Sequence, residues 1–529
     1  MKKNYFLLII FCFSLLSFQV NHDNIFTQTL SNENSAFVNS KLMAYTTLEP
    51  IFIDGNSNLI QFAKDHSLTG TGIQTDPILI QNFEISNNSY QTNIMINNTN
   101  LFIVIQNNLL GNVVNPILLE NDTNIKIYNN NISNVWSVIQ TGISVDKSTK
   151  ITIDSNTIYD WASNGIGIHL QNTMYSIITS NSINTNNVAN DMAIRLDTSS
   201  INTIIHNQIV GTGFYGIFIL NNSSYNSITF NNINLSNTNA NDIYISNFCN
   251  QNSVSSNTLI TTYIGIGLGN SFTNSLLNNT IYSQNTGISV SYGTANNISL
   301  NYIVNTNPNL KDTSTIGIFL GSSNNNFLLK NTIINEFTGI DLFSSYGNIF
   351  LFSFLTTNSL LKMPGSGTNR GIWITPNSGE NLFNESTISN FFYAFYIQDP
   401  TTILTFNNFI DNGYQTSQGY INGNSTTIKY NYWSDFTSPD NNHDGIVDYS
   451  YFISGNNPQN YDSDPLVTMF NKSIIYLSTI RSGNSLSTNE TNPTSTKTST
   501  KASDGFIAIP AIIGLSSVLI ARKYRKKSN

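Results

Sequence analysis

The chain has 529 residues, of which 10% are charged and 87 are Asn, and its formal net charge is −8. A hydrophobic content of 40% is enough for a sizeable core, and Ile, Phe and Tyr recur too often for a disordered chain. The scarcity of Lys and Arg excludes a nucleic-acid ligand, which needs clustered cations. The isolated Cys12 and Cys249 exclude a disulfide framework and a Cys-based metal site.

The first 80 residues predict three segments. Residues 1–22 combine a basic start with an apolar run from Tyr5 to Phe18, which is typical of a secretory signal peptide. Residues 23–49 form a leader. Residues 50–80 include the amphipathic stretch Ser57–His66, for which we expect a short helix that caps the N-terminal end of the following domain.

Residues 81–430 repeat one small unit, in which a Gly-Ile segment is followed by an Asn-x-Ile segment. Both markers recur at the same spacing of about 22–32 residues, which indicates a solenoid. The Ile of the first marker falls at Ile143, Ile166, Ile217, Ile266, Ile288, Ile318, Ile340 and Ile372, and looser copies place Ile94, Ile117, Ile194, Ile243 and Phe395 between them. The second marker begins at Asn108, Asn130, Asn156, Asn181, Asn207, Asn231, Asn257, Asn279, Asn301 and Asn331.

Apolar residues alternate with polar ones inside the Gly-Ile segments, as in TGISVD, and this period of two predicts strands. The unit is too short for a crossover helix, so the pattern predicts an all-β, right-handed, single-stranded parallel β-helix of about 13 coils. Ile and Val would stack inside it, and the repeated Asn residues would occupy turns or form amide ladders.

Residues 431–477 break the repeat and would form a C-terminal cap. Within them, DNNHDGIVD has the oxygen spacing of a calcium loop, which predicts a structural Ca²⁺ ion as the one cofactor. The predicted ligands are Asp440, Asn442, Asp444, the carbonyl of Ile446, and Asp448. The alternative is an acidic turn without a metal ion, because Tyr451 stands where such loops carry a further acidic ligand.

The C-terminal segments predict membrane attachment. Residues 478–504 are a Ser/Thr-rich stalk, residues 505–521 are an apolar transmembrane helix, and residues 522–529 are a basic cytoplasmic tail. This ending also resembles the sorting signals of archaeal surface proteins, in which the tail is cleaved and replaced by a lipid. Either arrangement places the body outside the cell.

Two sets of side chains are candidates for function. Alignment of the Gly-Ile strands places Asp146, His169 and Arg195 at one outward position, where they could bind or process a uronic acid, with Arg195 holding the carboxylate and His169 acting as base. The alternative is a solvated row of charges. The second set is an outward aromatic stripe suited to sugar or protein contact, consisting of Phe218, Tyr244, Phe319, Trp373 and Tyr396.

The segments IFIDGNSNLIQFAKDHSLTGTGIQTDPILIQNFEIS and YNYWSDFTSPDNNHDGIVDYSYFI resemble the opening and closing segments of NosD-like right-handed β-helix proteins. The resemblance covers about residues 50–470 and implies the fold. Founding members of that family assist the maturation of copper enzymes, and related β-helices include polysaccharide lyases, hydrolases, epimerases and adhesins. The five His residues are scattered here, which disfavours copper handling.

The favoured interpretation is a non-enzymatic protein anchored at the cell surface that binds glycans or other envelope proteins. A secreted carbohydrate-active enzyme that uses Asp146, His169 and Arg195 is the first alternative. An accessory protein for metalloenzyme maturation is the second.

Overall fold

The computed structural model describes residues 45–86, 90–133, 141–159, 164–185, 191–307, 314–357, 368–413, 417–423, 426–457 and 460–470. The predicted signal peptide, stalk, transmembrane helix and basic tail lie outside these residues, as does most of the predicted leader. In the described part of the chain, no helix is long and apolar enough to cross a membrane.

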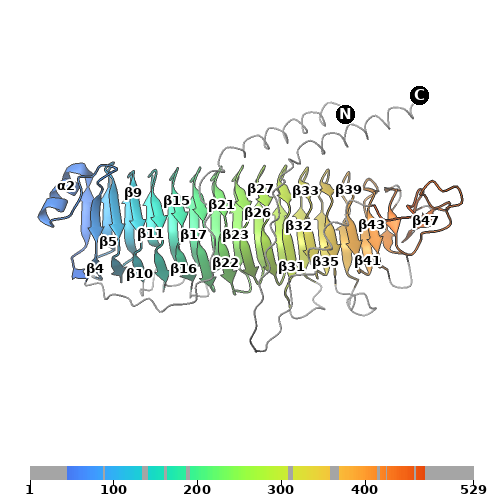
Figure 1. The fold of residues 1–529 in the computed structure, drawn as a ribbon, viewed down its shortest axis with the longest axis horizontal. Coiled ribbons are helices and arrows are strands. Elements are labelled where there is room, and N and C mark those ends of the chain that lie inside the picture. Colours follow the sequence, from blue (N-terminus) through green and yellow to red (C-terminus); the bar gives the residue numbers. More distant parts are fainter. Residues whose placement is uncertain are drawn as a thin grey trace, which may run out of the picture. The chain divides into compact units, whose positions relative to one another are not determined.

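The described residues wind into a parallel β-solenoid, and each coil contributes one strand to each of three sheets (Figure 1). The all-β fold of about 13 turns that the repeats predict is confirmed. The sheets hold 16, 15 and 16 strands in the described residues, because the segments at both ends add strands to those of the repeats. Strand β2 comes from the segment expected to cap one end, and strands β46 and β48 come from the segment expected to cap the other.

Sheet 1 contains the Gly-Ile segments. Its strands are β2 (Ile51–Asp54), β5 (Thr92–Asn97), β8 (Asn115–Glu120), β11 (Thr141–Asp146), β14 (Ile166–Gln171), β17 (Met192–Asp197), β20 (Tyr215–Leu220), β23 (Asn241–Ser246), β26 (Ile264–Gly269), β29 (Thr286–Ser291), β32 (Ile316–Gly321), β35 (Thr338–Phe343), β38 (Arg370–Ile374), β41 (Tyr393–Ile397), β44 (Gly419–Ile421) and β48 (Ser454–Gly455).

Sheet 2 follows sheet 1 in each coil. Its strands are β3 (Ile78–Gln81), β6 (Ile103–Gln106), β9 (Ile125–Tyr128), β12 (Thr152–Asp154), β15 (Ile177–Thr179), β18 (Thr203–Ile205), β21 (Ser227–Thr229), β24 (Ser253–Ser255), β27 (Ser275–Leu277), β30 (Asn297–Ser299), β33 (Phe327–Leu329), β36 (Ile349–Leu351), β39 (Leu382–Asn384), β42 (Ile403–Thr405) and β45 (Thr427–Lys429).

Sheet 3 contains the Asn-x-Ile segments. Its strands are β1 (Thr46–Thr47), β4 (Phe83–Ile85), β7 (Leu109–Gly111), β10 (Asn131–Ser133), β13 (Thr157–Tyr159), β16 (Ser182–Thr185), β19 (Gln208–Gly211), β22 (Asn232–Leu235), β25 (Thr258–Thr261), β28 (Thr280–Ser283), β31 (Tyr302–Asn305), β34 (Thr332–Ile334), β37 (Phe354–Thr356), β40 (Thr387–Ser389), β43 (Asn408–Ile410) and β46 (Tyr432–Trp433).

The core is a stack of inward Ile side chains, and the glycine of the Gly-Ile marker makes room for it. A Cβ atom at Gly287 or Gly317 would overlap the Ile303 or Ile333 side chain of sheet 3 in the same coil. Ile303 and Ile333 are themselves fully buried. The two sequence markers therefore keep the same period because they pack against each other across the interior.

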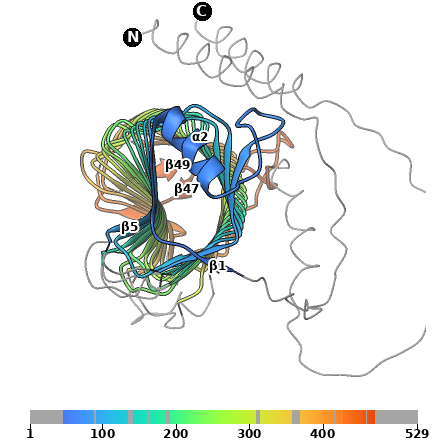
Figure 2. The ribbon, with the colours of Figure 1, turned by 90° about the vertical axis from the view of Figure 1, so that its left-hand side faces the viewer.

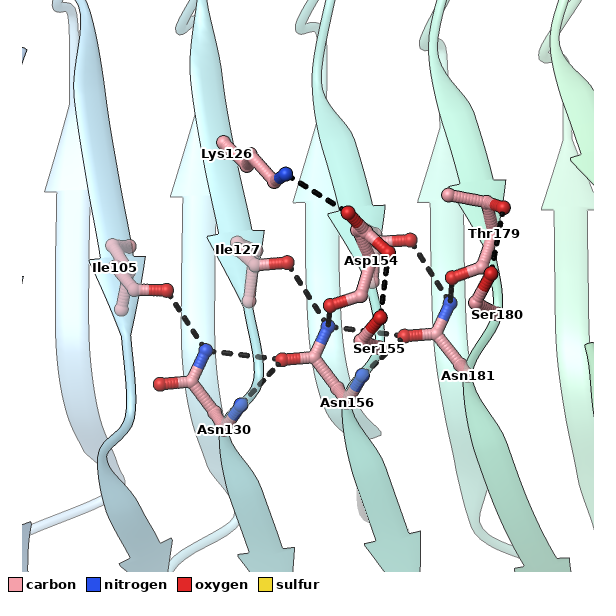
Figure 3. A network of polar contacts seen from close by, with 11 residues as sticks. Ile105, Lys126, Ile127, Asn130, Asp154, Ser155, Asn156, Thr179, Ser180 and Asn181 are labelled. Atoms are coloured by element: carbon pink, nitrogen blue, oxygen red, sulfur yellow. Dashed lines mark hydrogen bonds and ion pairs between the residues drawn. The ribbon is translucent and has the colours of Figure 1, made fainter. Parts of the chain in front are cut away.

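The Asn-x-Ile marker forms the predicted amide ladder at the turn before sheet 3 (Figure 3). The side-chain oxygen of Asn156 accepts hydrogen bonds from the backbone and side-chain nitrogens of Asn130, at 2.9 and 3.0 Å. The Asn130 side chain also donates to the Ile105 carbonyl at 2.9 Å. The ladder satisfies buried backbone groups that the turn would otherwise leave unpaired.

The predicted short helix is α2 (Gly55–Asp65), and Figure 2 shows it lying across the N-terminal end of the solenoid. Leu59 and Ala63 are its buried residues, and Phe62 packs against the core. At the other end, the antiparallel strands β47 (Tyr451–Phe452) and β49 (Tyr461–Asp462) pack behind Trp433, whose ring stacks on that of Tyr451 at 4.0 Å.

Candidate functional site

The outer face of sheet 1 brings His169 and Arg195 of the first predicted set into one row with the predicted aromatic residues. Register pairs His169 with Arg195 and Arg195 with Phe218, and the same row continues strand by strand to Tyr420. We call this row the central column. From Ser144 onward it contains Ser144, His169, Arg195, Phe218, Tyr244, Gly267, Ser289, Phe319, Asp341, Trp373, Tyr396 and Tyr420.

The aromatic side chains of the central column lie flat on the sheet in two places. A Cβ atom at Gly267 would overlap the Tyr244 ring, and one at Gly321 would come within 2.8 Å of the Phe319 ring. Each ring therefore covers the neighbouring glycine, and the five predicted aromatic residues are all partly exposed. Partly exposed rings in one row form a stacking surface, which is interrupted here at Gly267, Ser289 and Asp341.

Further aromatic residues enlarge the stripe at both ends. Tyr215, three residues before Phe218 on the same strand, stacks on Phe218 with ring centroids 4.3 Å apart and an interplanar angle of 9°. Tyr420 stacks on Tyr396 at 4.9 Å and 5°. Sequence reasoning missed Tyr420, because its strand lacks the Gly-Ile marker and has Gly419 where other strands carry the inward Ile.

Arg370 lies over the aromatic rings near the C-terminal end of the column. Its guanidinium carbon is 4.4 Å from the Trp373 ring centroid and 5.1 Å from that of Tyr396. Asp341 precedes Trp373 in the central column and is 7% exposed. Burial raises the pKa of Asp341 to about 6, and the charge of Arg370 partly offsets this effect. Arg370 was also missed, since a single Arg before a Gly-Ile marker carries no signal of its own.

The alignment that put Asp146 beside His169 and Arg195 was wrong. Asp146 pairs with Gln171, two residues beyond His169, and Gln171 pairs with Asp197. The cause is the doubled marker in NGIGI, where Ile168 rather than Ile166 occupies the position of Ile143. His169 and Arg195 do lie side by side on adjacent strands, and Asp146 lies in the next outward row.

The charged side chains near His169 form ion pairs with one another. Arg195 forms an ion pair with Asp197 at 2.8 Å, and Lys147 forms one with Asp146 at 3.2 Å. Burial opposes ionisation of Asp197, but hydrogen bonds from Arg195 and Asn221 outweigh it and lower its pKa. Burial and then the charge of Arg195 lower the pKa of His169 to about 4, so this imidazole is neutral at pH 7.

The predicted calcium loop folds around hydrogen bonds of its own. The Asp440 carboxylate accepts from the backbone nitrogens of Asp444 and Gly445, at 3.2 and 3.1 Å. Asp448 accepts from Asn441 at 2.9 Å. Among the residues that the structure describes, no group of three or more His, Cys, Asp or Glu side chains is placed to hold a metal ion. The loop nevertheless gathers several of the predicted oxygen donors, which is compatible with both the calcium interpretation and the metal-free alternative.

Comparison with known proteins identifies the fold. Residues 51–233 match the family model described as a right handed beta helix region. A search of the curated proteins returned no match. Similar solved structures include a tailspike protein of E. coli bacteriophage HK620 in complex with a pentasaccharide, at 10% identity and a TM-score of 0.47, covering 67% of this chain and 71% of that one.

Another similar structure is DFA-IIIase from Arthrobacter chlorophenolicus A6 in complex with DFA-III, at 12% identity and a TM-score of 0.41. It covers 54% of this chain and 84% of that one. At this level of similarity neither structure indicates what this chain binds. The chain is a parallel β-solenoid whose residues 51–233 match the right-handed β-helix family.

Proposed function

We propose that this protein is a non-enzymatic surface β-helix that binds an extended glycan along the outer face of sheet 1. The observation that carries the proposal is the central column, whose aromatic rings recur in register from Phe218 to Tyr420. One strand step advances about 4.8 Å along the solenoid. This spacing is close to the length of one sugar unit, so an extended chain can place one unit opposite each strand. Successive units then meet successive rings at Phe218–Tyr244 and at Trp373–Tyr420.

Binding is favoured over catalysis by the state of the predicted acid–base set. Asp146 lies in a different row from His169, and Arg195 is held by Asp197. With its pKa near 4, His169 is a poor base at neutral pH, because a general base works best when its pKa lies near the working pH. The carbohydrate-active enzyme remains the alternative, and turnover of a polysaccharide that disappears in His169→Ala would establish it.

The proposed location is the outside of the cell. The support is the signal peptide predicted at residues 1–22, the stalk and apolar segment predicted at residues 478–521, and the resemblance to NosD-like and archaeal surface proteins. Envelope proteins are then further candidate partners. Fractionation of expressing cells, with and without residues 505–529, tests this, and a protein that stays in the cytoplasm contradicts it.

We also propose that α2 closes the N-terminal end, where the first strands would otherwise present unpaired edges. Leu59, which is fully buried, is the contact that this role depends on. Leu59→Asp is expected to lower the melting temperature and promote aggregation, whereas Ile60→Asp, at a 42% exposed position of the same helix, is expected to have little effect. Equal behaviour of the two variants contradicts the proposal.

The third proposal is that the Asp440–Asp448 loop binds a structural Ca²⁺ ion. Calcium is expected to raise the melting temperature of the wild-type protein, and EDTA is expected to reverse the change. Asp440→Asn should abolish this response, while Asp65→Asn, at an exposed position of α2, should preserve it. An unchanged melting temperature in wild type would leave the loop as a metal-free turn.

A glycan array probed with wild type and Trp373→Ala tests the principal proposal. We expect wild type to bind a defined set of polysaccharides and Trp373→Ala to lose about tenfold or more in affinity for them. Tyr225→Ala is the matched control, because Tyr225 is 58% exposed in the turn between sheets 1 and 2. Identical profiles for wild type and Trp373→Ala would show that the central column does not bind the glycan.

A further inference from the structure

Arg370 is unusual among the cations on the face of sheet 1. It begins strand β38 and is only partly exposed. Burial lowers the pKa of its guanidinium, and the neighbouring Tyr396, Asp341 and Tyr393 partly offset this effect. Within the described residues it forms no ion pair within 4 Å, and its Nε atom is buried without a hydrogen-bond partner.

Some other cations of the chain differ from Arg370 because they form ion pairs. Arg195, seven strands earlier on the same face, is paired with Asp197 at 2.8 Å. Lys126 on sheet 2 lies over the Tyr128 ring at 4.4 Å, as Arg370 lies over Trp373, but it is also paired with Asp154 at 2.8 Å. A partly buried cation without a close anion is costly, and Asp341 acts on Arg370 only from beyond 4 Å. Arg370 can therefore accept an anionic ligand at closer range.

The surroundings of Arg370 favour an anion that offers two oxygen atoms to the guanidinium. Contacts with Trp373 and Tyr396 hold the guanidinium against the aromatic rings, and Nη2 donates to the Thr368 hydroxyl at 3.0 Å. A guanidinium binds carboxylate or sulfate oxygens through two parallel hydrogen bonds. Beside it in the central column lie Trp373, Tyr396 and Tyr420, and the last two are stacked on each other. All three are partly exposed, and their exposed parts can contact the sugar that carries the anion.

We propose that the glycan bound on this face is acidic, and that Arg370 pairs with its carboxylate or sulfate group while the sugar stacks on Trp373, Tyr396 and Tyr420. This inference rests on the proposed function and assigns the anion to Arg370 in place of Arg195. It gives the C-terminal part of the central column the charge-recognising role.

Asp341 makes this recognition dependent on pH. Asp341 lies opposite Trp373 on the strand next to that of Arg370, and its carboxylate acts on the same guanidinium. An ionised Asp341 therefore competes with the ligand for Arg370. As the pH falls below about 6, Asp341 becomes protonated and the competition weakens. Binding of an acidic glycan is therefore expected to strengthen as the pH falls from 7.5 to 5, and Asp341→Asn should remove most of this change.

The experiment measures binding of the purified protein to two matched pairs of polymers at pH 5. Polygalacturonate and its methyl ester differ by the carboxylate, and dextran sulfate and dextran differ by the sulfate. Wild type is expected to bind one acidic polymer about tenfold or more tightly than its neutral counterpart. The pair that shows the preference identifies the anion, and added salt should weaken it.

Arg370→Gln is expected to bind the acidic and neutral polymers of that pair equally. Arg370→Lys, which keeps the charge but not the planar fork, should retain part of the preference. Lys126→Gln is the matched control and should behave as wild type, because Lys126 lies on sheet 2. Unchanged melting temperatures would show that each variant is folded.

The outcomes separate the two proposals. A wild type that binds neutral and acidic polymers equally overturns the inference about Arg370 and leaves glycan binding intact. A preference that survives in Arg370→Gln also overturns it. If the protein binds none of the four polymers, the acidic assignment is overturned. The glycan array decides separately whether the face binds any glycan.

Discussion

Each Asn side chain of the ladder forms hydrogen bonds with several backbone groups. The buried side chain of Asn207 accepts from the backbone and side-chain nitrogens of Asn181, both at 3.0 Å, and donates to the Ile178 carbonyl at 3.0 Å. The high Asn content of the chain thus follows from repetition of one turn that needs a donor and an acceptor on the same side chain.

Asn207→Ala is expected to destabilise the coil around it by about 2–4 kcal/mol, because it leaves several buried polar groups unpaired. Hydrogen exchange should report the largest increase at the backbone amide of Asn181, which loses its acceptor. Asn232→Ala, at an exposed position of strand β22, is the control and should exchange as wild type. Equal exchange in both variants would show that the ladder contributes little.

Buried carboxyl groups predict how stability depends on pH. Asp242 occupies the position between Gly216 and Gly265 that is Gly or Ala in most strands of sheet 1, and Glu336 lies in the turn before β35; both are fully buried. Burial raises the pKa of each well above its ordinary value. The folded protein therefore binds more protons than the unfolded chain above pH 4, and stability falls as the pH rises.

The melting temperature of wild type is accordingly expected to be lower at pH 8 than at pH 5. Each such carboxyl contributes about 1 kcal/mol per pH unit while it remains protonated in the folded state. Asp242→Ala should reduce the difference between the two pH values, and Ala fits because Ala193 and Ala394 occupy equivalent positions. Asp65→Ala, at an exposed position, should leave the difference unchanged.

At the scale of the element, the ladder needs an acceptor where the repeats end, and Asp462 of strand β49 supplies it. Its Oδ2 atom accepts from the backbone and side-chain nitrogens of Asn431 and from the Trp433 indole, each at 3.1 Å. The C-terminal segment is therefore joined to the solenoid through the last Asn of the ladder.

Asp462→Ala is expected to release the segment after Trp433, because it leaves the Asn431 backbone amide and the Trp433 indole without an acceptor at a cost of about 1–3 kcal/mol each. The Asn431 side chain keeps its bonds to the Leu404 and Lys429 carbonyls. Limited proteolysis should cut this segment faster than in wild type. Asp462→Asn keeps an acceptor oxygen and should be cut more slowly than Asp462→Ala. Similar rates for Asp462→Ala and wild type would contradict this role.

Strands could be predicted where the sequence repeats, and register could not be predicted where a repeat is ambiguous. The Ile of nearly every Gly-Ile marker is buried as expected, because only one alternation fits a two-sided strand. NGIGI offers two such alignments, and the choice between them is made by the ladder, in which Asn156 bonds Asn181. Arg370 could not be predicted as a candidate site from the sequence, because its contacts are with rings on two strands that lie apart in the chain.

At the scale of the whole solenoid, each coil contacts its two neighbours, so the fold is close to one-dimensional. Strand β27 pairs with β30 so that Leu277 lies opposite Ser299, and the positive-φ positions Asn278 and Leu300 follow them. Residues 278–299 are thus one complete coil, whose removal joins equivalent positions of its neighbours.

Deletion of residues 278–299 is expected to give a folded protein, because Asn257 can then bond Asn301 and Gly267 can lie beside Phe319 in the same register. Its circular dichroism spectrum should match wild type, and its melting temperature should fall by only a few degrees. Deletion of residues 278–288 breaks the register and should cause aggregation.

The same coil deletion tests how much of the column the glycan contacts. If the glycan contacts only the rings near Arg370, the coil deletion should keep wild-type affinity. If it spans the column from Arg195 to Tyr420, affinity should fall, because the two ends then lie one strand step closer.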